Sequence, residues 1–172
     1  MTAEINEMDV SKPQCWVLVG MPASGKSTWI EELFKLNPDE DIRVVSSDNY
    51  IKEKADKDGI TYNEGFTKYG KAAQAYVFNV AKVLAKIQHK IVVIDRTNLT
   101  PKSRARFVKI FENTHELRAF VFPTPDAEEH YRRLNERLGK TIPNKVLKNM
   151  ATSYQQPTTD EGFIDVLLFE EY

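Results

Sequence analysis

Eight consecutive residues match the pattern G-x-x-x-x-G-K-[ST], which is typical of loops that bind nucleotide phosphates. The match runs GMPASGKS from Gly20 to Ser27. In such loops backbone N–H groups hold phosphate oxygens, the lysine (Lys26) places its charge on the β and γ phosphates and assists catalysis, and the hydroxyl (Ser27) binds Mg²⁺. We expect Gly20 and Gly25 to supply backbone angles that a Cβ would hinder. The motif predicts ATP and Mg²⁺ as cofactors, and nucleotide contacts from Ala23, Ser24, Gly25, Lys26, Ser27 and Thr28.

Two carboxylates follow β-branched runs and are candidates for acid–base chemistry. Asp48 could accept the proton of an attacking hydroxyl group and orient its oxygen toward the γ phosphate. The alternative is a turn or N-cap residue, because Ser-Ser-Asp-Asn is turn-like. Asp95 could hold the substrate hydroxyl or a magnesium-bound water, or could only fix the nearby loops by hydrogen bonds. Thr97 and Asn98 have the same two interpretations, substrate contact or turn geometry.

Arginines gather in one charged stretch near the end of the chain. Arg133 and Arg137 are four residues apart and share a face if the stretch is helical, so their guanidinium groups could clamp phosphates. We therefore predict that both bind the nucleotide and that Arg137 is also catalytic. The alternative is a solvated helix face on which Arg132 and Arg133 pair with nearby glutamates. Lys140 follows the stretch and could help.

These groups need a fold that brings distant segments together. Five short apolar runs predict strands at Cys15–Val19, Ile42–Val45, Ile91–Ile94, Leu117–Phe122 and Phe163–Phe169. Helical spacing and end signals predict helices at Lys26–Leu36, Tyr69–Gln88, Pro101–Phe111, Asp126–Leu138 and Pro143–Tyr154. The charged segment Lys52–Gly65 contains Asp58-Gly59 and is expected to be an exposed loop with room for a short helix.

Strands that alternate with helices predict an α/β fold with a mostly parallel central sheet and helices on both faces. Ligands of such sheets bind at the carboxyl ends of the strands. The phosphate loop, the Ser46–Asp48 segment and the Asp95–Asn98 segment all fall there. We expect a flexible tail at residues 1–13, one domain at 14–172, and an arginine-rich helical lid at about 126–150.

The composition of the chain limits which binding partners and which cell compartment are expected. The 172 residues include 24 Lys and Arg against 25 Asp and Glu, a net charge of −1. No overall basic field therefore indicates nucleic acid, which would need a local basic patch. The single cysteine, Cys15, favours a reducing compartment, and neither a membrane span nor a signal-peptide pattern is present. We expect a cytoplasmic protein with no membrane partner. The three histidines show no ligand spacing and are expected at the surface.

The class of phosphate-loop protein can be narrowed further. A GTPase would need an Asn-Lys-x-Asp segment, which is absent, and motor ATPases are usually longer. The short chain and the late arginines predict a small kinase with the P-loop kinase fold, which phosphorylates an alcohol group.

Four segments together resemble the polynucleotide 5′-hydroxyl kinase family, which includes a bacteriophage enzyme and the animal polynucleotide kinase-phosphatase. They are GMPASGKSTW, SSDNY, IDRTNLTPKSRARF and the late R-x-x-x-R…IP. The resemblance covers the chain from Cys15 to the end. It implies transfer of the γ phosphate of ATP to the 5′-OH end of DNA or RNA in nucleic-acid repair. It also implies Asp48 as general base, Asp95 and Thr97 as acceptor-binding residues, and Arg137 as a lid arginine.

The sequence departs from this family in places. Ile51 stands where the phage enzyme has an arginine that grips the substrate, and Ser47 stands where the family often has arginine; Lys52 or Lys54 could substitute. The D-x-D-x-T signature of the phosphatase domain is absent, which predicts a kinase alone. The ending IP…VLKNM…P…EGF also resembles the P-loop domain of heterogeneous nuclear ribonucleoprotein U-type proteins.

Three functions therefore stay open: a polynucleotide kinase, a small-molecule or toxin-type kinase, and a non-enzymatic, nucleotide-gated RNA-binding module. The adenine pocket is placed at Tyr154–Pro157 from topology alone, and the sequence does not predict an oligomeric state.

Overall fold

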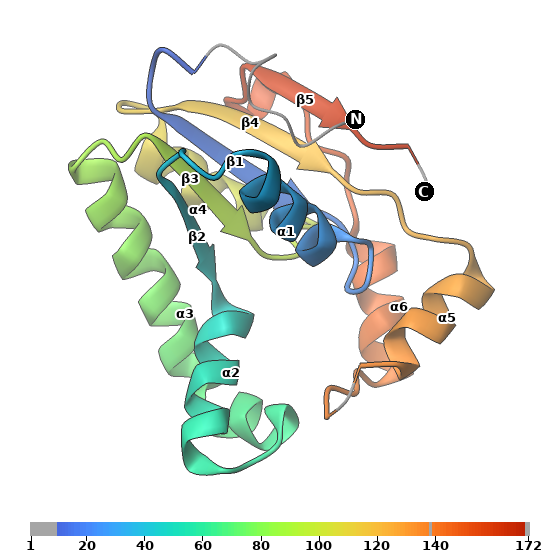
Figure 1. The fold of residues 1–172 in the computed structure, drawn as a ribbon. Coiled ribbons are helices and arrows are strands. Elements are labelled where there is room, and N and C mark those ends of the chain that lie inside the picture. Colours follow the sequence, from blue (N-terminus) through green and yellow to red (C-terminus); the bar gives the residue numbers. More distant parts are fainter. Residues whose placement is uncertain (1–9, 138, 171–172) are drawn as a thin grey trace.

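The computed structural model describes residues 10–137 and 139–170, which form an α/β domain around one five-stranded sheet (Figure 1). The strands are β1 (Gln14–Val19), β2 (Ile42–Ser46), β3 (Ile91–Asp95), β4 (Glu116–Val121) and β5 (Asp165–Leu168). The helices are α1 (Lys26–Leu36), α2 (Ser47–Asp58), α3 (Tyr62–Lys86), α4 (Pro101–Phe111), α5 (Ala127–Asn135) and α6 (Asn144–Ser153), with a 3-10 turn, η2, at Thr159–Glu161. The strand order is β2-β3-β1-β4-β5, and all of these described pairs are parallel, which confirms the predicted fold class.

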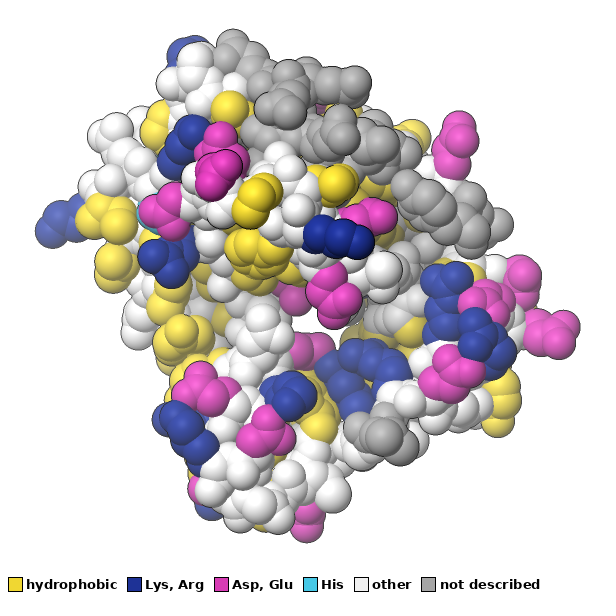
Figure 2. Space-filling model, viewed as in Figure 1, with side chains coloured by type: hydrophobic (Ala, Val, Ile, Leu, Met, Phe, Trp, Pro, Cys, Tyr) yellow, Lys and Arg dark blue, Asp and Glu magenta, His cyan; other side chains and the backbone are white. Residues whose placement is uncertain are grey.

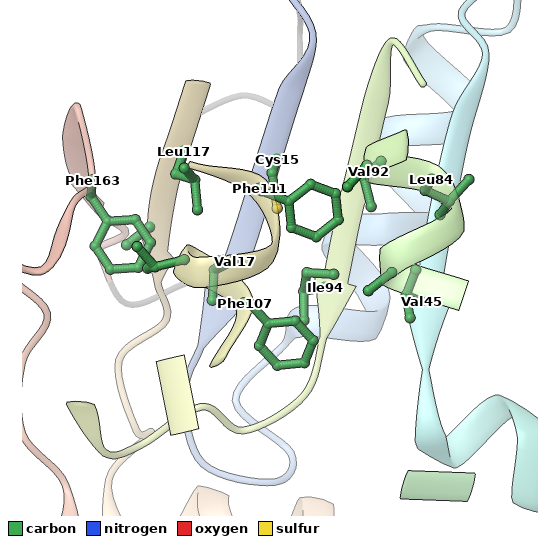
Figure 3. Packing of buried hydrophobic residues seen from close by; sticks show 14 of the residues in the cluster. Cys15, Val17, Val45, Leu84, Val92, Ile94, Phe107, Phe111, Leu117 and Phe163 are labelled. Atoms are coloured by element: carbon green, nitrogen blue, oxygen red, sulfur yellow. The ribbon is translucent and has the colours of Figure 1, made fainter. Parts of the chain in front are cut away.

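The central strand β1 is covered on both faces. All of its residues are buried, as expected for a parallel strand between two helical layers. On one face, Phe107 and Phe111 of α4 pack toward the strands together with side chains of α3 (Figure 3). On the other face, the ring of Trp29 in α1 lies 5.2 Å from the ring of Phe120. These two apolar layers hold the carboxyl ends of the strands in fixed positions.

The charged segment after β2 is mainly helical, so the predicted loop at Lys52–Gly65 is wrong. The hydroxyl of Ser46 accepts a hydrogen bond from the Asn49 N–H and starts α2 directly at the end of β2. Gly59 ends α2 with a φ of 67°, a conformation that glycine adopts readily. Thr61 then caps α3, which begins seven residues before the predicted helix.

The apolar face of α2 is so small that the charged residues around it hide the helical pattern in the sequence. Only Ile51 and Ala55 of α2 are buried. They pack against α3 at Gly65, where an added Cβ would lie 2.7 Å from the Cβ of Ala55. Ile51 is therefore a core residue at the α2–α3 contact and cannot face a substrate.

The predicted lid corresponds to α5, α6 and the stretch between them. The carboxylate of Asp126 accepts hydrogen bonds of 3.0 Å from the N–H groups of Glu128 and Glu129 and so caps α5. The helix ends at Asn135, before the predicted end at residue 138, which lies outside the described residues. Figure 1 shows α5 and α6 beyond the carboxyl edge of the sheet, across a gap from α2.

The predicted tail falls mostly on residues 1–9, which lie outside the described part of the chain. Val10 packs against the apolar layer on the α1 side, and Lys12 pairs with Glu116 at 3.0 Å. The packed domain thus begins before Gln14. Across the described ranges, no helix combines the length and apolar content that a membrane span requires.

Candidate active site

The phosphate loop joins the end of β1 to the start of α1. Ala23 and Gly25 have φ angles of 63° and 94°, so two of its residues are left-handed. Gly20 does not have a positive φ, and its predicted role in backbone geometry is wrong. An added Cβ at Gly20 would lie 2.7 Å from Ser24 Oγ and 3.1 Å from the carbonyl oxygen of Phe122. Lack of space, and not a backbone angle, requires glycine there.

Lys26 lies inside the loop that it follows. Its Nζ donates hydrogen bonds to the carbonyl oxygens of Gly20 (2.9 Å) and Met21 (2.7 Å) and to Ser24 Oγ (3.1 Å). The residue is 8% exposed. These bonds hold the ammonium group at the loop, where the motif places the phosphates of a nucleotide.

Charges from four other positions act on Lys26. Burial lowers the pKa of Lys26 to about 8; Asp95 and Asp48 oppose this decrease, and Arg137 and Lys140 add to it. The four charges come from the ends of β2 and β3 and from the stretch after α5. The fold therefore brings the predicted catalytic residues Lys26, Asp48 and Arg137 into one electrostatic environment.

Asp48 lies in the first turn of α2 and is held by two side chains. The hydroxyl of Tyr62 donates a 2.7 Å hydrogen bond to its Oδ1, and Nζ of Lys140 forms an ion pair with its Oδ2. The same Nζ lies 4.2 Å from the centre of the Tyr62 ring. Partial burial acts to raise the pKa of Asp48, but the charge and hydrogen bond of Lys140, helped by Tyr62 and Arg137, lower it below its usual range.

Asp95 ends β3 beside Ser46, its neighbour on β2. Burial raises the pKa of Asp95 above its usual range, although Lys26 and a hydrogen bond from Ser46 act to lower it. The negative charge of Asp48 raises it further. The two carboxyl groups of the site therefore have pKa values that are shifted in opposite directions, which is how proteins give two like groups different roles.

The segment after Asp95 connects the site to the central strand. The carbonyl oxygen of Thr97 accepts a 3.0 Å hydrogen bond from the N–H of Gly20. Asn98 is 3% exposed, has a φ of 48°, and donates from Nδ2 to the carbonyl oxygen of Leu18 at 2.8 Å. Asn98 thus has the structural role that was one of its two interpretations. Thr97 is half-buried, and its predicted contact with a substrate stays a prediction.

The arginines of the lid divide into two groups. Arg137 follows α5, and its charge acts on Lys26, Asp48 and Tyr62. Arg132 and Arg133 instead pair with Glu129 on the same helix. The pairing of Arg133 matches the alternative of a solvated helix face, and nucleotide binding by Arg133 stays a prediction.

The predicted lid contacts both sides of the site. His130 of α5 donates from Nε2 to the carbonyl oxygen of Pro22 in the phosphate loop at 2.7 Å. Beyond α5, Lys140 bonds to Asp48, and the Thr141 N–H donates to Asn63 Oδ1 at the start of α3. In Figure 2 a hollow separates the lower part of the molecule, formed by α2 and the start of α3, from the lid, and lysine and arginine side chains gather beside it.

Sequence reasoning missed Tyr62, which contacts the site, and Arg104, which supports the loop after β3, and it also misplaced His115, which lies away from the site. Tyr62 fell in the predicted loop, where nothing indicated a partner for Asp48. His115 is buried, so its predicted surface position is wrong. Arg104 is fully buried in α4 and binds both carboxylate oxygens of Glu161 at 2.7 Å and the carbonyl oxygens of Asn98 and Gln155 at 2.9 and 3.0 Å.

A signal for Arg104 was present in the sequence. It lies three, four and seven residues before the buried Phe107, Val108 and Phe111, so helical spacing places it on the inner face of α4. Its guanidinium group ties the loop after β3 to the segment that precedes β5.

The oxygen atoms around the loop are compatible with Mg²⁺. Ser27 is exposed in the first turn of α1, and Asp95 lies within electrostatic range of Lys26. Within residues 10–137 and 139–170, no group of three His, Cys, Asp or Glu side chains could form a complete metal site. Mg²⁺ in phosphate sites usually takes one or two protein ligands together with waters and phosphate oxygens, so such a site would not need one.

The strand order β2-β3-β1-β4-β5, with the phosphate loop after β1 and helices on both faces, is consistent with a P-loop kinase domain. The family model described as "AAA domain" (AAA_33) matches residues 15–157, well over half of the chain, and the chain belongs to this family.

Three solved structures share the fold. Chaetomium thermophilum Kti12 in complex with ADP-AlF3 has a TM-score of 0.62 at 16% identity, over 90% of this chain and 88% of that one. A chain of the Pnkp1/Rnl/Hen1 RNA repair complex has a TM-score of 0.64 at 23% identity, over 93% of this chain and 49% of that one. A fungal RNA kinase has a TM-score of 0.59 at 17% identity, over 93% and 75%. At these identities the likeness shows the fold alone.

Proposed function

We propose that this protein is an ATP-dependent polynucleotide 5′-hydroxyl kinase. One observation carries the proposal: Asp48, in the first turn of α2, shares an electrostatic environment with the phosphate-loop Lys26 and with Arg137 and Lys140 of the predicted lid. The lowered pKa keeps Asp48 ionised, and an ionised carboxylate beside a phosphate loop can accept the proton of an attacking hydroxyl group.

In the proposed reaction, the 5′ oxygen of the acceptor forms a bond to the γ phosphorus of ATP. The bond from that phosphorus to the β–γ bridging oxygen breaks, and ADP leaves. The acceptor hydroxyl gives its proton to Asp48. Lys26 and Arg137 offset the charge of the transferring group, and the Ser27 hydroxyl would hold Mg²⁺, which neutralises phosphate charge when bound.

Two kinds of similarity support a polynucleotide acceptor. The segments around Asp48 and Asp95 resemble those of polynucleotide 5′-hydroxyl kinases, in which the residues matching Asp95 and Thr97 lie near the acceptor. One structural neighbour is named as part of an RNA repair complex, and another is named as a fungal RNA kinase. Because Ile51 is 1% exposed, the nucleic acid must be held by groups elsewhere on the molecule.

Transfer of labelled γ phosphate to 5′-OH oligonucleotides tests the proposal. We expect transfer by the natural chain and a fall in kcat of about 10²–10⁴-fold for Asp48→Asn, because the base is lost. ATP affinity should stay within about twofold, since the phosphate loop is intact. Asp56→Asn, also on α2 but exposed and paired with Lys52, is the matched control and should keep full activity.

Two results would contradict the proposal. Normal turnover by Asp48→Asn would show that Asp48 is not the general base. ATP binding without transfer to any oligonucleotide would exclude the acceptor; a panel of nucleosides and sugars would then test a small-molecule kinase, and ATP-sensitive oligonucleotide binding without turnover would indicate an RNA-binding module.

A further inference from the structure

The near-neutral total charge hides a strongly basic segment. Between Gly65 and Phe111 there is one carboxylate, Asp95, and there are ten basic residues: Lys68, Lys71, Lys82, Lys86, Lys90, Arg96, Lys102, Arg104, Arg106 and Lys109. The segment has a net charge of +9, so the rest of the chain, with 14 basic and 24 acidic residues, has −10. Such asymmetry indicates an anionic partner for the segment.

Part of this charge lines a groove between α3 and α4. The groove has a volume of about 590 Å³ and is lined by Lys82 and Lys86 of α3, Arg106 and Lys109 of α4, and the ring of Phe78 between them. The four cationic side chains are exposed. No carboxylate in the described part of the chain lies within ion-pair distance of them.

This lack of pairing contrasts with α2 and α5, where most of the lysines and arginines are paired. On α2 and α5, lysines and arginines are paired with carboxylates three or four residues away, as in Lys52–Asp56, Lys57–Glu53 and Arg132–Glu129. Charges that are paired in this way are largely satisfied on the protein. The cations of the groove are free to neutralise a polyanion.

Arg96 links one end of the groove to the candidate active site. The guanidinium of Arg106 lies 3.6 Å from the centre of the Phe78 ring, and that of Arg96 lies 5.8 Å from the same ring. Stacking on the ring fixes the planar guanidinium and leaves its N–H groups available. Arg96 directly follows Asp95. Burial and the charge of Arg106 lower the pKa of Arg96, and the charge of Asp48 opposes this decrease. Arg96 therefore lies within electrostatic range of both the proposed base and the groove.

We propose that the α3–α4 groove binds the phosphodiester backbone of the acceptor strand, on the 3′ side of the nucleotide whose 5′-OH reaches Asp48. The direction of the bound strand rests on the proposed function. The strand would run from Asp48 past Arg96 to Arg106 and the lysines of the groove. From Phe78 to Lys86, α3 spans roughly 12 Å, about three to four stacked nucleotides. A concave, basic groove suits a single chain of phosphates better than it suits a flat membrane surface.

Oligonucleotide binding in the absence of ATP tests the groove independently of phosphoryl transfer. The variant is Lys82→Gln/Lys86→Gln/Lys109→Gln, and the charge-matched control is Lys35→Gln/Lys57→Gln/Lys90→Gln, which changes exposed lysines outside the groove. Fluorescence anisotropy with a labelled 12-nucleotide 5′-OH strand should show at least a tenfold weaker Kd for the groove variant and less than a twofold change for the control. The slope of log K against log salt should fall by about 0.7 for each lost phosphate contact, or about 2 in total.

Acceptor length separates the groove from the chemical site. In the groove variant, the loss of kcat/KM should grow with acceptor length and level off beyond about four nucleotides. If phosphoryl transfer fails in every form but oligonucleotide binding is lost only in the groove variant, the groove assignment stands and the proposed activity falls. Equal binding by the groove variant and the control overturns the groove assignment. So does tighter, groove-dependent binding of a polyglutamate peptide or of phosphatidylserine vesicles.

Discussion

Asp48 and Asp95 carry identical carboxyl groups whose pKa values are shifted in opposite directions by their positions. Burial raises the pKa of Asp95, whereas Lys140 and Tyr62 lower that of Asp48 despite its partial burial. Asp48 therefore loses its proton at a lower pH than Asp95 does. Only an ionised carboxylate can accept a proton, so the electrostatics favour Asp48 as the base of the proposed reaction.

Lys140→Gln should shift the acid limb of the pH–rate profile. The change removes the main influence that lowers the pKa of Asp48, so this pKa rises and Asp48 becomes protonated at a higher pH. The acid limb of kcat/KM should move to higher pH, measured by oligonucleotide phosphorylation from pH 4.5 to 8. Tyr62→Phe, which removes a hydrogen bond but no charge, should shift it in the same direction by less. An unmoved acid limb in both variants would mean that Asp48 does not control it.

At the scale of elements, some of the site follows from local pattern and some does not. The apolar runs end at Ser46 and Asp95, so the meeting of the strand ends could be predicted. The contact of Tyr62 with Asp48 depends on a turn at Gly59 that folds α3 back along α2, and charged side chains hide the small buried side of α2. The Arg104–Glu161 pair joins residues 57 positions apart, which no helical or strand spacing connects.

Breaking the Arg104–Glu161 pair should measurably lower the stability of the fold. Arg104 has no exposed side-chain area and Glu161 has little (16%), so Glu161→Gln leaves a buried guanidinium without its counter-charge. We expect the free energy of unfolding to fall by about 3 kcal/mol, measured by urea titration with tryptophan fluorescence. Arg104→Met/Glu161→Met should cost less than the single change, because no buried charge is left unpaired. Glu53→Gln, at an exposed pair on α2, is the control and should change stability little.

The whole molecule is organised by sheet position and by charge. β1 is bonded on both sides and buried on both faces, whereas β5 is partly exposed and, among residues 10–137 and 139–170, is bonded only to β4. The charged residues are also segregated, with the basic segment on α3, α4 and the loops beside them. The phosphate loop follows β1, and the groove lies between α3 and α4, whose buried side chains pack in the same apolar layer as those of β1.

Amide hydrogen exchange should be slower in the central strand β1 than in the edge strand β5. Amides of β1 should exchange only through global unfolding, since opening β1 breaks two neighbouring strand pairs and both apolar layers. Amides of β5 should exchange faster by local opening at the edge. Equal protection of β1 and β5, measured by NMR or mass spectrometry, would show that the sheet opens as one unit.

Cys15 gives this chain a practical advantage for measuring motion. It is the sole cysteine in the sequence, lies in β1 with no exposed surface, and has a pKa raised by burial, so its thiol is shielded from maleimides in the folded state. Two cysteines introduced at Glu136 and Glu53 could therefore be labelled with fluorescent dyes without replacing a natural residue. Energy transfer between the dyes would follow the distance from the lid to α2 as ATP and oligonucleotide are added.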